Sequence, residues 1–501
     1  MSLLQFASQS RLLLIGALIV LTGCRPGHEQ GAAPQSAAAP APAPAAAPEH
    51  AATMFTVAQL NEREINRRGV ETVIWAMPAV NYDLMRQEMI DATEGEVGQV
   101  IFWGKPLSWH NQTLTPNPDT LYFMGFFDLK NSGPMVIEIP PADSGAVNCN
   151  IVTAWQMPLE DVGKLGIDKG AGGKFLILPP GSDKPAPKGF IALHSDTYGG
   201  FFLCRSNLAS HADADVEASM KYGKRIKFFP LSELGSPRES TVYVDVMNTD
   251  FDATIPYDAH FFEALNRVVQ AEPWIERDRA MIDSLKTLGI EKGKPFNPDA
   301  ATRKLLDEAA QEAHAVLEAR YEAGWGNFFP GTQWRAAAPD EFIRAASNGY
   351  NDPNVYPVDA RGTTYTYGYV GIKRLGAGQF YLMTIKDKGG AALEGGKNYR
   401  LRVPPNVPVQ QYWSVTVYDR QTHALVRDVP RVSRASNVTE VVRGDDGSVD
   451  IFLGPAAPAG KEANWIPTDP NRPFELMFRF YGPTQALFDK SWTLPDVERM
   501  Q

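Results

Sequence analysis

The stretch from Ser108 to Leu129 constrains the fold of this chain more than any other feature. It begins with polar and aromatic residues and ends as a strand, Leu121 to Leu129, that is apolar on both faces. A strand with one solvated face alternates apolar and polar residues, whereas a strand buried on both faces is apolar throughout. We therefore predict a central strand in a sheet that is covered on both sides.

Two prolines stiffen the loop before this strand. Pro116 and Pro118 have a fixed φ, and each biases the residue before it, Thr115 and Asn117, toward extended backbone. Side chains alternate along an extended chain, so we expect Thr115, Asn117 and Asp119 to share one side. A rigid loop beside a strand is a suitable place for a functional site.

The same stretch carries side chains suited to acid–base chemistry. His110 or Asp119 is a candidate general base, and Asn117 is a candidate to stabilise developing negative charge. We predict a site with catalytic residues His110, Asn117, Asp119 and Tyr122, and with ligand contacts from Trp109 and Asn111. An alternative stays open, because Asn117 and Asp119 are also typical turn residues that bond their own backbone.

Length, charge and composition bound the class of protein. The chain has 501 residues, a net charge of −10 and a pI near 5.4. It has no basic stripe, so we expect no nucleic-acid partner. Its 39 prolines, 42 glycines, 17 tyrosines and 25 phenylalanines favour a β-rich, loop-rich protein. The length allows two or more domains.

The N-terminus indicates export. Arg11 precedes an apolar run, Leu12 to Leu21, which is short for a permanent membrane span and typical of a signal peptide. The run ends in Leu-Thr-Gly-Cys24, which resembles the bacterial lipobox. We expect residues 1–23 to be a signal peptide and Cys24 to be lipidated, for example with palmitate. The alternative is a signal peptide that ends in cysteine by chance.

A lipid on Cys24 makes the membrane a partner of the chain. The residue after Cys24 is arginine rather than aspartate, which in lipoproteins of this type favours the outer membrane over the inner one. Residues 24–52 form an Ala/Pro-rich tether that cannot build a core. We therefore expect a cell-envelope protein, lipid-anchored and facing the periplasm.

Two cysteines remain, and each lies in a run typical of a strand. They are Cys149 and Cys204. The periplasm permits a disulfide between them, but two buried free thiols explain the sequence equally well. Their spacing matches neither a metal-binding cluster nor a redox motif.

The pattern of strands and helices predicts three folded regions. We expect a β-sandwich domain over residues 53–255, a helical bridge over 256–350 and a second β-sandwich domain over 351–501. The fold class is β-rich α+β, with two sandwich or jelly-roll-like domains joined by the helical segment.

Several elements are predicted in detail. Phe55 to Gly69 is expected to be a short helix ended by its glycine, with partly helical chain after it that Pro78 interrupts. The strongest helix in the bridge begins at the cap Asn297 and ends at Gly324. The strand pattern returns at Tyr365 to Val370.

A second candidate site lies on the C-terminal sheet. Alternation places Tyr412, Ser414, Thr416 and Tyr418 on one face and Trp413, Val415 and Val417 on the other, while Arg479 and Tyr481 oppose Leu476, Phe478 and Phe480. A polar, aromatic face with one arginine is suited to a sugar or a small acid, and Trp465 is a further candidate contact. An ordinary half-solvated sheet face is the open alternative.

Common catalytic and cofactor motifs are missing from the sequence. It contains no G-x-S-x-G, no H-E-x-x-H, and no G-x-G-x-x-G between a strand and a helix. The eight histidines are scattered, so spacing alone identifies neither a metal nor another cofactor. A metal site assembled in three dimensions from His110, Asp119 or His194 remains open.

Several runs carry a resemblance to known families. Leu107-Ser-Trp-His-Asn-Gln112, Thr115 to Tyr122 and Gly133 to Pro141 resemble the bacterial domain of unknown function numbered 1254, and Leu288 to Phe296 resembles its C-terminal extension. Tyr412 to Asp419, Gly447 to Pro455, Asn464 to Thr468 and Phe478 to Pro483 are similar to the paired domain numbered 1214. The resemblance covers most of residues 70–497. It implies two β-sandwiches with helices between them and a homo-oligomer, and it implies no settled activity.

Three functions are compatible with these features. The first is a periplasmic hydrolase or lyase for a small molecule or saccharide, with Arg479 positioning an anion. The second is a binding protein for a carbohydrate or small acid, and the third is an envelope scaffold without a ligand. The concentration of Trp109, His110, Asn117, Asp119 and Tyr122 in one stiff stretch favours the enzyme.

Overall fold

The computed structural model describes residues 54–95, 97–164, 166–236, 241–368, 370–374 and 378–500. One compact unit comprises Thr56 to Gln501. The predicted signal peptide, the lipidation site Cys24 and the tether lie outside the described residues.

A six-stranded sheet forms the centre of the N-terminal half. Its strands, in spatial order, are β11 (Tyr243–Asp245), β1 (Val100–Phe102), β3 (Thr120–Asp128), β9 (Gly199–Asn207), β5 (Val147–Thr153) and β6 (Pro158–Gly163). The predicted central strand is confirmed, because β3 lies between β1 and β9 and both of its faces are buried. Leu121, Phe123 and Phe127 face one core, while Met124 and Phe126 face another.

A second sheet packs against the first and completes a β-sandwich. Its strands are β10 (Lys227–Pro230), β4 (Met135–Ile139), β7 (Gly173–Leu178) and β8 (Phe190–His194). Ile137, Phe175 and Ile177 from this sheet meet Phe123 and Phe202 of the six-stranded sheet in a shared core. A short ladder joins β12 (Phe251–Asp252) to β2 (Asn111–Gln112).

The C-terminal half is a second β-sandwich. One sheet consists of β13 (Arg335–Ala336), β14 (Gln379–Thr384), β20 (Phe474–Tyr481), β16 (Trp413–Asp419) and β17 (Ser433–Ala435), and the other of β19 (Trp465–Pro467), β18 (Val449–Gly454), β15 (Tyr399–Val403) and β21 (Glu498–Arg499). The two predicted faces of β16 and β20 are confirmed, because Trp413, Val415, Val417, Leu476, Phe478 and Phe480 all point into the core between the sheets.

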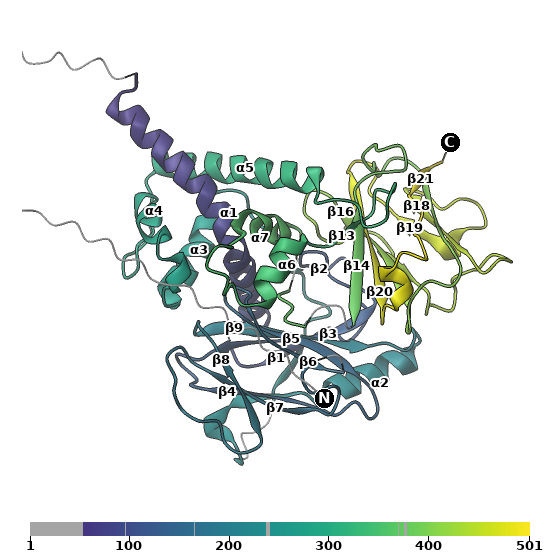
Figure 1. Ribbon diagram of the computed structural model, residues 1–501, viewed down its shortest axis with the longest axis horizontal. Coiled ribbons are helices and arrows are strands. Elements are labelled where there is room, and N and C mark those ends of the chain that lie inside the picture. Colours follow the sequence, from purple (N-terminus) through teal and green to yellow (C-terminus); the bar gives the residue numbers. More distant parts are fainter. Residues whose placement is uncertain are drawn as a thin grey trace, which may run out of the picture. The chain divides into compact units, whose positions relative to one another are not determined.

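Helices cover the outer face of the six-stranded sheet (Figure 1). The layer is built mainly from α1 (Val57–Ala92), α3 (Ala259–Ala271), α4 (Met281–Thr287), α5 (Ala300–Ala323), α6 (Asp340–Ser347) and α7 (Val358–Thr366), while α2 (Asp213–Gly223) and α8 (Gln485–Phe488) lie within the two sandwich halves. The chain is thus an α+β protein with two β-rich domains and a helical segment between them. The layer also takes in residues on both sides of the predicted bridge 256–350, namely α1 and α7.

Helix α1 differs from its prediction. Gly69 does not end it, and the helix continues through Pro78 to Ala92. A Cβ atom on Gly69 would lie 2.6 Å from Cβ of Ala309 on α5, so the glycine permits a close helix–helix contact. Burial of residues from Gly69 onward stabilises one long helix across the proline.

Two further boundaries differ from the sequence prediction. Helix α5 is capped by Asp299 instead of Asn297, although Gly324 ends it as predicted. The strand predicted from Tyr365 to Val370 is wrong in the described residues, because Tyr365 and Thr366 end the buried helix α7 and the next strand is β14. Arg361 anchors α7 by donating to the carbonyl oxygen of Trp75 at 2.7 Å, and such tertiary contacts outweigh the strand propensity of the neighbouring threonines.

Cys149 and Cys204 form a disulfide. Cys149 on β5 and Cys204 on β9 are directly opposite in the ladder, with their Cα atoms 4.0 Å apart. Of the two interpretations of the sequence, the structure selects the bridge.

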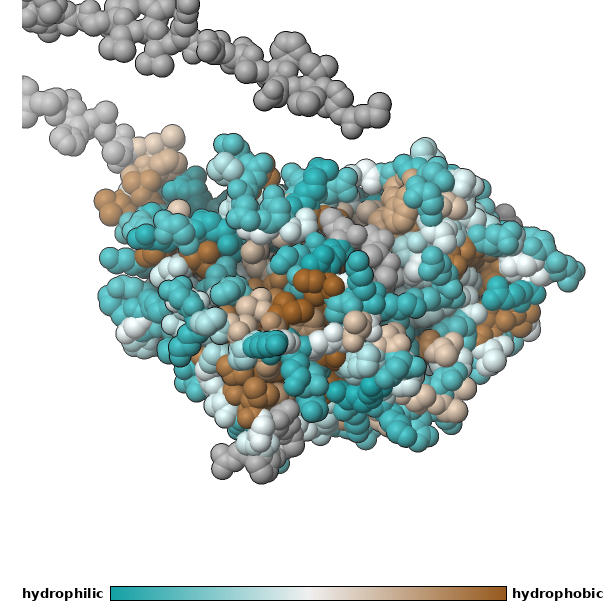
Figure 2. All heavy atoms as spheres, turned by 60° about the horizontal axis from the view of Figure 1, so that its bottom comes forward, coloured by the Kyte–Doolittle hydropathy of each residue, from teal (hydrophilic) through white to brown (hydrophobic). Residues whose placement is uncertain are grey.

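The surface shows no single large apolar face in the view of Figure 2, where hydrophilic residues predominate and hydrophobic ones gather in small patches. Within the described ranges, every helix is too short or too polar to cross a bilayer.

Candidate functional site

A cavity of about 410 Å³ lies where the two β-sandwiches and the helical layer meet. Its floor is the helix-facing side of the six-stranded sheet, and its opposite wall is β14 and β20. Helix α1 contributes Met85 and helix α6 contributes Ile343. Exposed side chains of Asp340, Arg374 and Phe488 border it, so this end is the mouth of the cavity.

The strand register arranges the floor of the cavity from apolar to polar. Tyr122 on β3 is opposite Arg205 on β9, which is opposite Asn148 on β5. In the next row Met124 is opposite Leu203, which is opposite Asn150, and Asn150 is opposite Asp161 on β6. Trp103 and Leu107 continue the apolar end. The charged and amide side chains of the floor are therefore confined to β9, β5 and β6.

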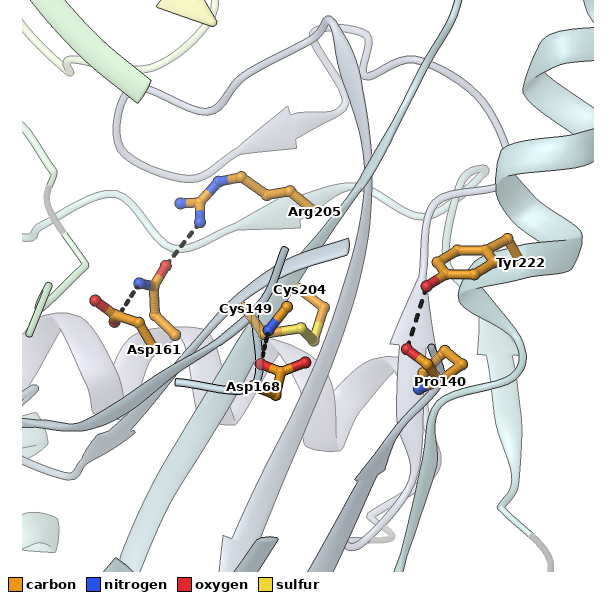
Figure 3. The surroundings of a disulfide bond; sticks show 9 residues. Pro140, Cys149, Asp161, Asp168, Cys204, Arg205 and Tyr222 are labelled. Atoms are coloured by element: carbon orange, nitrogen blue, oxygen red, sulfur yellow. Dashed lines mark hydrogen bonds between the residues drawn. A yellow bond between two sulfur atoms is a disulfide. The ribbon is translucent and has the colours of Figure 1, made fainter. Parts of the chain in front are cut away.

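Arg205 is the partly exposed cation of this floor. Its Nη1 donates to Asn150 Oδ1 at 2.8 Å, and Asn150 Nδ2 donates to Asp161 Oδ1 at 2.9 Å. Figure 3 shows Arg205 and Asp161 joined through this intervening amide, near the Cys149–Cys204 disulfide. Two backbone N–H groups, of Lys373 and Arg374, also bind Asp161. The carboxylate is thus held away from the guanidinium.

Arg479 on β20 is a further cation of the cavity besides Arg205 and Arg374, and it is almost fully buried. It donates to Thr416 Oγ1 at 2.9 Å, to the Thr115 carbonyl oxygen at 3.1 Å and to the Tyr418 hydroxyl at 2.6 Å. Tyr381 is opposite it in the ladder, with its ring 5.0 Å from the guanidinium carbon. All the partners of Arg479 in the described structure are uncharged.

Both arginines stay charged. Burial alone would lower the pKa of Arg205, but the Tyr122 and Tyr381 hydroxyls raise it above its ordinary value. Burial likewise opposes the charge of Arg479, and Tyr418 and Tyr481 raise its pKa. Neither guanidinium has a carboxylate oxygen within 4.0 Å among the residues that the structure describes. Uncompensated charge next to an apolar cavity is costly, so this arrangement favours an anion as its partner.

The loop predicted to carry catalysis lies against the C-terminal sheet. Asn117 Nδ2 donates to the Tyr481 hydroxyl, and the Tyr412 hydroxyl donates to the Asp119 carbonyl oxygen at 2.8 Å. The Tyr418 hydroxyl donates to the Pro116 carbonyl oxygen at 2.6 Å. The two predicted sites are therefore joined, but by a buried contact that we call the seam, formed by residues 115–119 with Tyr412, Tyr418, Arg479 and Tyr481.

The backbone of this loop departs from one expectation. Thr115 has a φ of 36°, so it is not extended. Its N–H donates to the His423 carbonyl oxygen at 2.7 Å, and its hydroxyl donates to the Tyr367 carbonyl oxygen at 2.8 Å. These two contacts outweigh the bias that Pro116 imposes on the residue before it.

The side chain of Asp119 is buried and does not line the cavity. Ser433 Oγ donates to its Oδ1 at 3.0 Å, and His211 Nε2 lies 3.4 Å from the same oxygen. Burial lowers the pKa of His211, but Asp119 and Glu440 together raise it above its ordinary value. Asn117 is also buried and engaged, since its Oδ1 accepts from the Asp119 N–H at 3.0 Å.

The other predicted site residues are dispersed. His110 stacks on Trp109 with ring centroids 3.8 Å apart, and its Nδ1 lies 2.5 Å from Asp250 Oδ1. Its side chain is 42% exposed, and neither ring lines the cavity. Asn111 and Tyr122 do line it. Trp465 lies in the other C-terminal sheet, where its Nε1 donates to Gly454 O at 2.9 Å. The catalytic roles predicted for His110, Asn117, Asp119 and Tyr122 stay predictions.

Sequence reasoning missed the polar floor of the cavity. Arg205 follows the apolar run Phe201 to Cys204, and Asn148 and Asn150 alternate with apolar residues of β5. Such alternation in a buried strand indicates one polar face, and it was the available signal. In the described ranges, no three histidine, cysteine, aspartate or glutamate side chains are grouped so that they could hold a metal ion.

Comparison with known proteins agrees with this architecture. Residues 97–230 match the model described as "Protein of unknown function (DUF1254)", and residues 378–485 match "Protein of unknown function (DUF1214)". No curated protein matches the chain.

Two crystal structures are similar to the chain. The VPA0106 protein from Vibrio parahaemolyticus is 18% identical with a TM-score of 0.54, over 87% of this chain and 100% of that one. A putative uncharacterized protein from Burkholderia cenocepacia is 12% identical with a TM-score of 0.39, over 88% and 95% of the two chains. The first likeness supports the fold. The chain is therefore a protein in which the domains of unknown function DUF1254 and DUF1214 occur together, in that order.

Proposed function

We propose that this protein binds a small organic anion with an apolar body in the cavity between its two β-sandwiches. One observation carries the proposal: Arg205 and Arg479 border an otherwise largely apolar cavity without a carboxylate partner in the described structure. An anionic group of the ligand would supply the missing negative charge at Arg205, and the positive charge of Arg479 on the opposite wall would attract the same group.

The size and lining of the cavity fit such a ligand. A volume of about 410 Å³ falls in the range of small-molecule sites. Met85, Met124 and Met477 line it, and methionine side chains adapt to ligands of varied shape. The apolar end beneath α1 would hold the body of the ligand.

A saccharide fits this cavity less well than an organic acid. Sugars carry hydroxyl groups on every side, so their sites need polar partners along the whole cavity. Here four charged and amide side chains of the floor gather on β9, β5 and β6, namely Arg205, Asn148, Asn150 and Asp161, while Trp103, Met124 and Leu203 form an apolar end. The ligand therefore has one polar end.

A hydrolase or lyase is the weaker candidate. It retains support from Tyr122, which lines the cavity beside Arg205. His110 and Asp119, the proposed proton carriers, lie outside the cavity lining, and acid–base catalysis requires hydrogen-bond reach of the reacting atom. An activity that is lost in both His110→Ala and Asp119→Asn would restore this candidate.

We further propose that Cys24 anchors the protein in the outer membrane, with the folded unit in the periplasm. The lipobox-like sequence supports the anchor, and the Cys149–Cys204 disulfide is typical of an oxidising compartment. Labelling with a palmitate analogue should mark the wild-type chain and not Cys24→Ser. Equal labelling of the two proteins would contradict the anchor.

Calorimetry on the full chain tests the ligand class. Octanoate, octanol and octylamine share one apolar body and differ in charge, so we expect octanoate alone to bind with measurable heat. Arg205→Gln should weaken octanoate binding at least about tenfold, because a hydrogen bond to a charged group contributes about 1.5–3 kcal/mol.

The matched control is Arg279→Gln, which removes an exposed arginine that does not line the cavity. It should bind octanoate as the wild type does. Binding of octanol as tightly as octanoate, or full binding by Arg205→Gln, would contradict the proposal.

A further inference from the structure

One amide on the floor of the cavity has an oxygen without a partner. Asn148 lies on β5 directly opposite Arg205 on β9, one position from the disulfide pair. Its Oδ1 accepts no hydrogen bond from any described residue. A buried acceptor left without a donor costs about 1–3 kcal/mol, so its presence at a cavity wall calls for an explanation.

The other amides that line the cavity have their oxygens engaged. Asn81 Oδ1 accepts from Gln156 Nε2 at 2.7 Å, and Asn111 Oδ1 accepts from the Thr113 hydroxyl at 2.7 Å. Asn150 Oδ1 accepts from Arg205, and Gln379 Oε1 accepts from the Tyr381 hydroxyl. Asn148 therefore differs from its neighbours in holding a buried acceptor without a partner beside the proposed anion site.

We propose that the ligand is a hydroxycarboxylic acid with an aliphatic body. This inference rests on the proposed function above and specifies its ligand. The carboxylate binds Arg205, and the Asn148 amide turns its buried oxygen toward the cavity to accept from a hydroxyl close to the carboxylate. Directly opposite residues on one face of an antiparallel pair have Cβ atoms about 5 Å apart, so neighbouring groups of one ligand can contact both side chains.

Charge selects the hydroxyl over other donors. An ammonium group would also donate to Asn148, but it would lie beside the guanidinium of Arg205 and within the field of Arg479. Like charges in a poorly hydrated site repel strongly. An uncharged donor avoids this repulsion, so an amino acid is disfavoured against a hydroxy acid of the same length.

The hydroxyl should determine specificity. A site that offers a hydrogen bond to a hydroxyl discriminates against the analogue without it, because the polar group of the protein then stays unpaired. We expect 2-hydroxyoctanoate or 3-hydroxyoctanoate to bind the full chain about tenfold more tightly than octanoate, which corresponds to about 1.4 kcal/mol.

Calorimetric titration of these three acids tests the proposal. In Asn148→Ala the affinities for the hydroxy acid and for octanoate should fall within about twofold of each other. The control Asn471→Ala, at an exposed asparagine that does not line the cavity, should keep the tenfold preference. Circular dichroism checks that each variant is folded.

The outcomes separate this inference from the proposed function. Equal affinity of wild-type protein for octanoate and both hydroxy acids overturns the hydroxyl contact and leaves anion binding in place. A preference that persists in folded Asn148→Ala also overturns it. If none of the acids binds the wild type, the proposed function and this inference are both wrong. The wild-type comparison needs no variant, so a misfolded Asn148→Ala cannot hide a negative result.

Discussion

The two ends of strand β20 bury opposite charges on the same face, and only one of them is neutralised. Glu475 Oε1 lies 2.9 Å from His423 Nδ1, and its Oε2 accepts from the Tyr321 hydroxyl at 2.5 Å. Arg479, four residues further on, has only uncharged partners among the described residues and borders the cavity. Buried charges that only support the fold are normally paired. The unneutralised end of β20 is therefore the end where a ligand is expected.

The paired cluster of Glu475, His423, Glu318 and Arg420 also joins the helical layer to the C-terminal sheet. His423 Nε2 lies 3.2 Å from Glu318 Oε1 on α5, and Arg420 binds the other oxygen of the same carboxylate. Burial opposes protonation of His423, but Glu475 and Glu318 raise its pKa to about 9. The imidazolium is thus shared between two carboxylates from different layers.

The largest effect is expected from removing one charge of the paired cluster. Glu475→Gln leaves the imidazolium of His423 with less compensation in a buried site, so we expect the free energy of unfolding to fall by about 4 kcal/mol. Urea denaturation followed by tryptophan fluorescence measures this change. Glu322→Gln, at a glutamate whose side chain is 67% exposed, should change stability by less than about 0.5 kcal/mol. Similar losses in both variants would contradict the distinction between the two ends of β20.

The pH dependence of stability provides a second, smaller test. The pKa of His423 is raised from 6.5 to about 9 in the folded protein, so the protonated form is favoured by folding. Its stabilising contribution is fully present below pH 6.5 and is lost as the pH rises through 9, by up to about 3 kcal/mol. Melting temperatures should fall over this window in the wild type. A folded His423→Gln variant should lack that decrease, and an unchanged pH profile would show that His423 is not the titrating group.

The smallest effect on stability is expected from giving Arg205 a carboxylate partner of its own. Asn148→Asp places a carboxylate opposite Arg205, so we expect octanoate affinity to fall about tenfold because the anion then competes with a side chain. The free protein should become more stable, by about 1 kcal/mol, as its cation gains a partner. Calorimetry and thermal melting check the two changes. Unchanged affinity would mean that Arg205 does not bind the anion.

Much of the fold was accessible from the sequence because it depends on local alternation. The run Leu121 to Leu129 is apolar on both faces and is the buried strand β3, and the opposite faces of β16 and β20 follow from period-two spacing. Gly69 and α7 were mispredicted because their roles depend on the partner that packs there, Ala309 for the glycine and Trp75 for Arg361. The secondary-structure propensity of a residue does not show which distant residue will pack against it.

The candidate site was less accessible for a related reason. Tyr122 and Arg479 were identified from their own strands, but Arg205, Asn148 and Asp161 become significant only when β9, β5 and β6 are placed in register. Whether a charge is compensated is a property of pairs of distant residues. The sequence offered an arginine in an apolar strand, and it could not indicate that no carboxylate would lie beside it.

In the seam, the C-terminal sheet binds the loop of residues 115–119 largely through main-chain atoms of that loop. Tyr412, Tyr418 and Arg479 donate to carbonyl oxygens of Asp119, Pro116 and Thr115. Every residue type offers the same carbonyl, so these contacts depend on the path of the loop and little on the identity of its side chains. Related chains could change Thr115 and Asp119 and keep these main-chain contacts, provided that they keep Pro116 and Pro118, which direct the backbone. The donors, in contrast, are the side chains of Tyr412, Tyr418 and Arg479, so replacing these residues would remove the contacts.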